Sequence, residues 1–206
     1  SGGWIGVDPY PGACEAIQHL LELGHQRIGG LRGVKGDPSS DERYNAIVQA
    51  LAEHGLETQR WTWSGEYTLE TGVEAGAALA QLPQKIRPTA VITTSEFTAY
   101  GLIEGVSRYG LSVPENLSMV GYDNTPFAEV FRPALTVIAQ PIDQMGAMAV
   151  EQILHSIMAE TERQLPPIAP LAGTLNKQNT TKKEAKDIVL PTYLVKRSST
   201  AIAPEN

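Results

Sequence analysis

The hydrophobic positions of this chain follow two different periods in turn. Short apolar runs of strand length occur at residues 4–8, 28–31, 89–93, 117–121 and 134–140, bounded mostly by glycine, proline or polar residues. Between these runs, apolar residues recur at spacings of three and four, which predicts amphipathic helices. Strands that alternate with helices are typical of a parallel sheet flanked by helices, so we expect an α/β fold.

The best-marked helix is expected to start at Ser39. Ser39 and Glu42 match the Ser-x-x-Glu capping pattern, in which each side chain bonds to the backbone of the other residue. The helix is expected to end at Gly55, since glycine readily takes the left-handed conformation that closes a helix.

The last third of the chain predicts one long helix and then irregular sequence. The helix after Pro141 has an apolar stripe formed by Ile142, Met145, Ala149, Ile153 and Ile157. Residues 163–187 have loop composition, rich in proline and small polar residues. Residues 188–195 predict one or two short strands, interrupted by Pro191.

Composition and charge narrow the function. With 206 residues and 42% hydrophobic content, the chain can bury a core as one domain or as two small lobes. With a net charge of -7, the chain as a whole lacks the excess of basic residues that direct nucleic-acid binding requires. A single cysteine, Cys14, excludes an internal disulfide and a thiolate metal site, and no apolar run approaches the roughly 18 residues of a membrane span. We expect a cytoplasmic protein without a metal or cofactor, cut from a longer chain.

Candidate chemistry gathers where the predicted strands end. Asp123 follows the apolar run 117–121, and Gln140 ends the next one. In an open α/β sheet, ligands bind beyond the carboxyl ends of the strands, so both side chains are expected to face a crevice. The glycine-rich loop at 29–36 lacks both phosphate-binding spacings, so its glycines are assigned to turns.

Arg43 is the most informative cation. In a helix that starts at Ser39, Arg43 lies in the first turn, where the macrodipole disfavours a cation by roughly 0.3 to 1 kcal/mol. An anionic or oxygen-rich partner would explain its position, since a guanidinium can donate two hydrogen bonds to adjacent hydroxyls. A surface salt bridge to Asp41 or Glu42 is the alternative explanation.

The pair Trp61 and Trp63 alternates on a strand-like run, which places both indoles on one face. Aromatic rings suit the faces of sugars, but such pairs on strands more often pack into cores. We therefore assign both tryptophans to packing.

One long stretch resembles a known family. The residues GYDNTPFAEVFRPALTVIAQPIDQMGAMAVE, together with VPENLSMVGYDN and ELGHQRI, are similar to the LacI/GalR family of bacterial transcription regulators. The similarity runs over residues 7–156 and resumes at 194–200. It implies the type I periplasmic-binding-protein-like fold, in which two lobes with Rossmann-like sheets bind an effector between them, and it implies a homodimer.

The resemblance divides the chain into parts. Residues 1–139 would form the C-terminal lobe, and 140–162 a helix that belongs to the N-terminal lobe, most of which would be absent here. Residues 163–187 would be an irregular loop and 188–206 terminal strands with a tail. The helix stripe after Pro141 is then expected to be buried against the partial sheet, a second copy of the chain or neighbours in a crystal. The homodimer contact is expected on the helix after Ser95, at Phe97, Gly101 and Glu104.

The resemblance also implies a set of effector-binding residues. Arg43 and Asp123 would bind hydroxyls, Tyr67 in the sequence GEY would stack on the ligand, and Ser95, Gln140 and Ser39 would complete the polar lining, with Asp37 as a further candidate. Two departures stand out. Ala46 and Ile47 replace a glycine and an aromatic residue, and Ser95 with Glu96 replaces an Asn-Asp pair.

These observations favour an effector-binding region of a LacI-type regulator, which senses a sugar or a related polar metabolite. No chemistry is expected on the ligand, and DNA would be bound only through a separate N-terminal domain. A periplasmic sugar-binding protein of an ABC-type uptake system is the main alternative. An enzyme on a doubly wound sheet is the other, but no nucleophile with an adjacent base is apparent.

Overall fold

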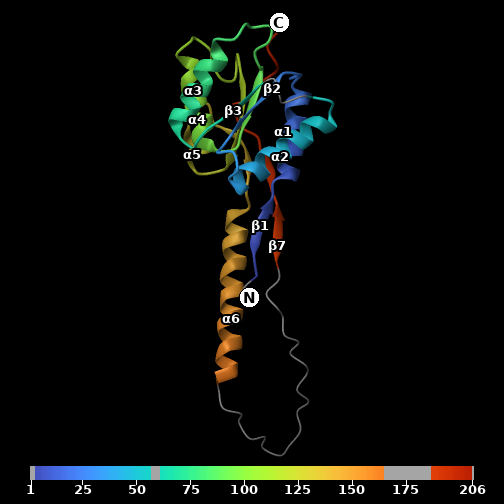
Figure 1. Cartoon of the computed structure of the whole chain (residues 1–206), viewed down its shortest axis with the longest axis vertical. Coiled ribbons are helices and arrows are strands. Elements are labelled where there is room, and N and C mark those ends of the chain that lie inside the picture. Colours follow the sequence, from blue (N-terminus) through green and yellow to red (C-terminus); the bar gives the residue numbers. More distant parts are fainter. Residues whose placement is uncertain (1–2, 57–60, 165–186, 206) are drawn as a thin grey trace, which may run out of the picture. The chain divides into compact units, whose positions relative to one another are not determined.

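The computed structural model describes residues 3–56, 61–164 and 187–205. Its contacts divide the chain into two compact units (Figure 1). The larger unit comprises Pro9–Gln140 and Pro191–Asn206, and the smaller unit comprises Ser1–Asp8 and Pro141–Leu190. The described residues 3–8, which the sequence assigned to the C-terminal lobe, are therefore grouped by their contacts with the smaller unit.

The larger unit is built on a mostly parallel sheet, where the apolar runs predicted a parallel one. The strand order is β3-β2-β4-β5-β6-β8. The neighbours from β3 to β6 pair in parallel, and only β8 is antiparallel to its neighbour β6. The strands are β2 (Ile28–Arg32), β3 (Thr62–Ser64), β4 (Ala90–Thr93), β5 (Ser118–Asp123), β6 (Thr136–Ala139) and β8 (Tyr193–Val195).

Helices cover both faces of this sheet (Figure 1). They are α1 (Tyr10–Glu22), α2 (Pro38–Glu53), α3 (Leu69–Ala80), α4 (Glu96–Ser107) and the short α5 (Phe127–Val130). Successive strand residues point to opposite faces, so Ile92 packs with α1 and α2 while its neighbour Val91 packs with α3 and α4. The fully buried strands thus supply two cores, which is the arrangement expected of a parallel sheet.

Helices α3 and α4 pack backbone against backbone through glycines. A Cβ added at Gly101 would lie 2.1 Å from the carbonyl oxygen of Leu69, and one at Gly72 would lie 2.3 Å from that of Thr98. Only residues without a side chain fit at such distances. Gly101 therefore faces α3, and its prediction as part of a homodimer contact is wrong.

The start of α2 differs from the predicted one. Asp37 is the N-cap, and its carboxylate accepts a hydrogen bond of 2.8 Å from the backbone N–H of Ser40. Pro38 is the first helical residue, where its missing N–H costs nothing. The prediction of a cap at Ser39 is therefore wrong. Arg43 lies in the second turn, so the macrodipole argument made for it is wrong as well.

The order of the strands reverses next to β2. From β2 the chain crosses to β3 on one side of it and then returns to β4 on the other. Such a switch point opens a crevice beyond the carboxyl ends of the two strands, and ligands bind there in open α/β sheets. The loops after β2 and β4 and the start of α2 are therefore placed to form a site.

The smaller unit contains β1 (Ile5–Asp8), β7 (Ile188–Pro191) and α6 (Ile142–Gln164). The two strands form a two-stranded sheet, and the backbone N–H of Ile188 donates to the carbonyl oxygen of Trp4. Residues 188–195, for which one or two strands were predicted, thus form two strands, and these belong to two separate sheets. Helix α6 continues to Gln164, two residues into the predicted loop, and the rest of that loop at residues 165–186 lies outside the described ranges.

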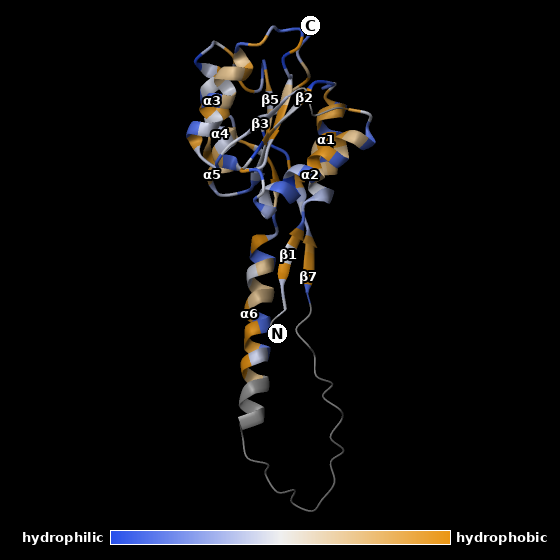
Figure 2. Ribbon diagram, in the orientation of Figure 1, coloured by the Kyte–Doolittle hydropathy of each residue, from blue (hydrophilic) through white to orange (hydrophobic). Residues whose placement is uncertain are grey.

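Helix α6 leaves three of its five stripe residues exposed, while Met145 and Ala149 are half-buried. Ile142, Ile153 and Ile157 are each more than half exposed. Figure 2 shows hydrophobic positions along much of this helix. The prediction that the partial sheet buries the stripe is wrong for this single chain, and burial against a second copy stays a prediction. Among the described residues, no helix combines the length and apolar character needed to cross a membrane.

Candidate functional site

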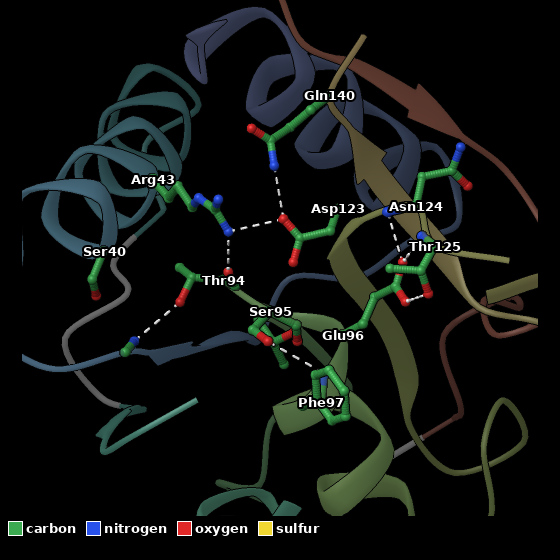
Figure 3. A network of polar contacts seen from close by, with 12 residues as sticks. Ser40, Arg43, Thr94, Ser95, Glu96, Phe97, Asp123, Asn124, Thr125 and Gln140 are labelled. Atoms are coloured by element: carbon green, nitrogen blue, oxygen red, sulfur yellow. Dashed lines mark hydrogen bonds and ion pairs between the residues drawn. The ribbon is translucent and has the colours of Figure 1, made fainter. Parts of the chain in front are cut away.

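Polar groups converge at the carboxyl edge of the larger sheet (Figure 3). Thr94 follows β4, Asp123 ends β5 and Gln140 follows β6. Arg43 reaches the same place from α2, which packs on one face of the sheet. Four separate segments thus supply one cluster, and the strand order at the switch point brings them together.

The ion pair between Arg43 and Asp123 forms the centre of the cluster. Arg43 Nη1 lies 3.0 Å from Asp123 Oδ1 and donates a second bond of 2.9 Å to the carbonyl oxygen of Thr94. The guanidinium carbon lies 4.3 Å from the centroid of the buried Tyr122 ring, a cation–π contact that fixes its plane. Both hydrogen bonds leave from one nitrogen, so the planar fork has further N–H groups to offer a ligand.

Asp123 is held from a second side by Gln140. The amide nitrogen Nε2 of Gln140 donates to Asp123 Oδ1 at 2.8 Å. Burial raises the pKa of the Asp123 carboxyl and the nearby charge of Glu96 raises it further, whereas the cation of Arg43 opposes both effects. The carboxylate is therefore costly to keep charged in this place, as is common for groups at functional sites.

The backbone at the end of β5 is strained. Asp123 has φ 104° and the next residue, Asn124, has φ 79°. Positive φ values in residues other than glycine cost of order 1 to 3 kcal/mol each and persist only where neighbours enforce them. Such strain concentrates at ligand sites, and here it aims the Asp123 side chain along the sheet edge toward Arg43.

Buried Glu96 and half-buried Arg197 hold this strained turn. Glu96 Oε1 accepts hydrogen bonds from the backbone N–H groups of Asn124 and Thr125 at 2.6 and 2.7 Å, and Arg197 Nη2 donates to Asn124 Oδ1 at 2.6 Å. The sequence marked Glu96 only as a departure from the family pattern, and it did not mark Arg197. Neither role has a signal in local spacing, because both depend on how distant segments meet.

Tyr67 lies at the end of β2. A Cβ on Gly33 would lie 2.4 Å from Cζ of the Tyr67 ring, so the ring rests on the bare backbone of this glycine. The Gly33 N–H in turn donates to Thr94 Oγ1 at 3.0 Å, which ties this loop to the cluster. Tyr67 is about one third exposed, so its ring is available to a ligand at this edge.

The other side chains predicted to line the site lie at the starts of α2 and α4. Ser95 is buried, and its Oγ accepts from the N–H of Phe97 as the N-cap of α4. Asp37 caps α2, and Ser39 is exposed on the first turn of that helix. One residue further on, Ser40 is fully buried, and its Oγ has no hydrogen-bond partner in the described structure. Ser39 and Ser40 lie four and three positions before Arg43, one turn earlier on α2, so we add Ser40 to the candidate lining beside Ser39.

The tryptophan pair lies away from the polar cluster. Trp61 and Trp63 line a separate hollow of about 130 Å³ between β2, β3 and α3, together with residues such as Leu79. Trp63 is 41% exposed, so its assignment to core packing is wrong. Trp61 is half-buried, and its Nε1 donates to the carbonyl oxygen of Ile86 at 2.9 Å.

This arrangement suits the recognition of hydroxyl groups. A carboxylate accepts, a guanidinium donates and an amide does both, which matches ligands that carry several hydroxyls. In the described parts of the chain, no group of three or more His, Cys, Asp or Glu side chains is arranged to hold a metal ion.

Comparisons with known proteins identify the family to which the chain is similar. The model of the periplasmic binding protein-like domain family matches residues 17–200. The HTH-type transcriptional repressor PurR of Glaesserella parasuis is 33% identical over 160 residues, which cover 77% of this chain and 46% of that protein. The HTH-type transcriptional repressor CytR of Escherichia coli is 35% identical over 157 residues, with 76% and 46% covered. The chain therefore spans about half the length of the curated relatives it matches.

Solved structures show the same relationship. A LacI family transcriptional regulator from Enterococcus faecium with bound ribose has a TM-score of 0.78 and 26% sequence identity, covering 98% of this chain and 66% of that one. A LacI transcriptional regulator from a Rhodococcus species has a TM-score of 0.77 and 28% identity, covering 97% and 65%.

Proposed function

The chain belongs to the periplasmic binding protein-like domain family, as the effector-binding region of a LacI/GalR-type regulator, and from this premise we propose that it binds a sugar or a related small polar metabolite. The ligand would lie at the carboxyl edge of the larger sheet. The ribose in the Enterococcus faecium regulator supports this ligand class.

The observation that carries the proposal is the meeting of Arg43 and Asp123. The two residues are 80 positions apart in the sequence, yet their charged groups lie 3.0 Å from each other. A sugar hydroxyl can donate to the carboxylate and accept from the guanidinium, so one ligand would use both charges. Gln140 would add an amide, and the Tyr67 ring would cover an apolar face of the sugar.

The proposed regulator acts without chemistry on its ligand. Its relatives are named as transcriptional repressors. The net charge of -7 supports a division of labour in which DNA is bound by a part of the regulator outside these 206 residues. Such a protein works in the cytoplasm. A periplasmic sugar-binding protein shares the fold, but the relatives and structural neighbours named above are regulators.

A homodimer is part of the proposal. Phe97, Phe127 and Val130 are each more than half exposed on α4 and α5. Exposed apolar side chains of this size are uncommon without a partner, and LacI-type regulators dimerise. We further propose that α6 belongs to an N-terminal lobe of the effector-binding region, whose other elements would cover its exposed stripe.

Calorimetric titration with ribose and a panel of other pentoses and hexoses tests the ligand proposal. We expect the Arg43→Ala and Asp123→Asn variants to bind the best member of the panel at least about thirtyfold more weakly, because each leaves a partly buried charge without its partner. Arg43→Lys should recover only part of the loss, since an ammonium cannot donate through a planar fork.

Arg108→Ala is the matched control. Arg108 is exposed and pairs with Glu104 one turn before it on α4, so the variant should bind like the wild type. Wild-type affinity in Arg43→Ala would contradict the proposed site. If neither this region nor a longer regulator that contains it bound any sugar, the proposed ligand class would be wrong.

A further inference from the structure

Glu96 is a buried carboxylate with an unusual number of partners. It is the first residue of α4, and only 2% of it is exposed. Oε1 accepts from the backbone N–H groups of Asn124 and Thr125, and Oε2 accepts from the Thr125 hydroxyl at 2.6 Å (Figure 3). Backbone N–H groups can only donate, so this oxygen is committed to the turn that follows β5.

The turn that Glu96 holds is the one that directs Asp123. Asp123 and Asn124 both have positive φ, which the chain would leave if its N–H groups were released. The direction of the Asp123 carboxylate follows from this backbone, and so does its contact of 3.0 Å with Arg43. Glu96 lies outside the Arg43–Asp123 contact itself, so its influence on a ligand would be exerted through the turn.

The same carboxylate also reaches an aromatic pair. The Tyr100 hydroxyl donates to Glu96 Oε2 at 3.1 Å, and the Tyr100 ring lies 4.4 Å from that of Phe131, centroid to centroid. Both rings are half-buried, close in sequence to the exposed Phe97 and Val130. One side chain thus bonds to the turn after β5 and to an aromatic pair whose sequence neighbours are proposed for the homodimer.

We propose that Glu96 is a positioning residue that fixes the 123–125 turn for effector binding and couples this turn, through Tyr100, to the aromatic pair. This inference rests on the proposed function for its ligand. It assigns to the position after Ser95 a role in affinity and in communication, beyond the capping of α4.

Two substitutions of Glu96 in the full 206-residue chain separate the hydrogen bonds of this side chain from its charge. Glu96→Ala removes every bond to the turn. Glu96→Gln keeps the shape: its oxygen can accept from both N–H groups, and its amide can donate to the two hydroxyls. Tyr100→Phe removes one hydroxyl and leaves the ring pair in place.

Amide hydrogen exchange tests the position without any ligand. We expect the N–H groups of Asn124 and Thr125 to exchange at least tenfold faster in Glu96→Ala and at a rate close to wild type in Glu96→Gln. Ribose is the binding probe. Its affinity should fall at least about tenfold in Glu96→Ala, remain within about threefold in Glu96→Gln, and fall two- to fivefold in Tyr100→Phe.

The pKa of Asp123, measured by NMR from the resonance of its carboxyl carbon as pH changes, tests the effect of the Glu96 charge. Arg43 from α2, Glu96 from α4 and Gln140 after β6 face this carboxyl, and the charge of Glu96 raises its pKa. The midpoint should therefore move down in Glu96→Gln. A role limited to stabilising α4 would leave this midpoint unchanged.

The outcomes distinguish this inference from the proposed function. If ribose and the other sugars bind neither the wild type nor a longer regulator that contains it, while Glu96→Ala exposes the two amides and Glu96→Gln shifts the Asp123 midpoint, the positioning role stands and the ligand class is wrong. If sugars bind and Glu96→Ala leaves affinity, amide exchange and the Asp123 midpoint unchanged, the positioning role is wrong and the proposed function stands.

Discussion

The helices of the larger unit and the long helix of the smaller unit have the same type of apolar stripe, but only the former bury it. Leu102 and Val106 on α4 are almost completely buried, whereas Ile153 and Ile157 on α6 are 59% and 56% exposed. Periodicity in a sequence predicts that a helix has an apolar face. Whether the face is covered depends on a partner, which the period does not encode.

Glycines show the same difference at the level of single atoms. Gly101 on α4 has the Leu69 carbonyl oxygen where a side chain would begin, while Gly146 on α6 has no atom within 4 Å of that place. One glycine is required by packing, and the other only weakens its helix. Replacing glycine by alanine should therefore lower the free energy of unfolding at Gly101 and raise it at Gly146.

The largest expected effect is that of Gly101→Ala. Its methyl group would force α3 and α4 apart, so the free energy of unfolding should fall by about 3 kcal/mol, as for other overpacked cores. Urea unfolding followed by circular dichroism measures this loss. Gly146→Ala is the matched control and should stabilise the chain by up to about 1 kcal/mol through helix propensity. Equal effects of the two substitutions would remove the difference between the units.

A smaller effect is expected from pH in the larger unit. The pKa of Asp123 is raised in the folded chain, so the native state binds a proton more tightly than the unfolded state does. The stability that this provides is fully present below the ordinary pKa of an aspartate, about 3.9, and is lost as pH rises through the raised value. The wild type should therefore lose stability relative to Asp123→Asn across this window, measured by urea unfolding at successive pH values. A wild type that gained stability relative to Asp123→Asn as pH rose would show a lowered pKa of Asp123 instead.

The smallest effect is expected on α6. Replacing both Ile153 and Ile157 by glutamine should change the free energy of unfolding of the single chain by no more than about 0.5 kcal/mol, because these side chains are already in water. Leu102→Ala on α4 is the control, with an expected loss of about 2 to 5 kcal/mol. Unfolding at a concentration where sedimentation shows monomers measures both. A loss like that of the control would mean that the stripe is buried.

The fold followed from the sequence because strands and helices repeat in a fixed order. The runs that gave β2, β4, β5 and β6 are short and continuously apolar, and a strand that is buried on both faces requires this. The centre of the site could be predicted for a related reason. Asp123 and Gln140 follow such runs directly, so the rules for open sheets already place them at the ligand edge.

The remaining parts of the site depend on contacts that have no local signal. Nothing in the spacing around Glu96 shows that its carboxylate meets a turn 28 residues later. Helix α2 starts earlier than predicted because Asp37 and Pro38 together cap a helix better than Ser39 does, and this moved Arg43 from the first turn to the second.

The packing of the Tyr67 ring on Gly33 means that substitutions at these two positions depend on each other. Any larger residue at 33 would displace the ring, and without the ring the bare backbone of this loop would lose its cover. In a library randomised at both positions and selected for binding, aromatic residues at 67 should therefore survive almost only beside glycine at 33. A deep mutational scan would record the pair as strong epistasis.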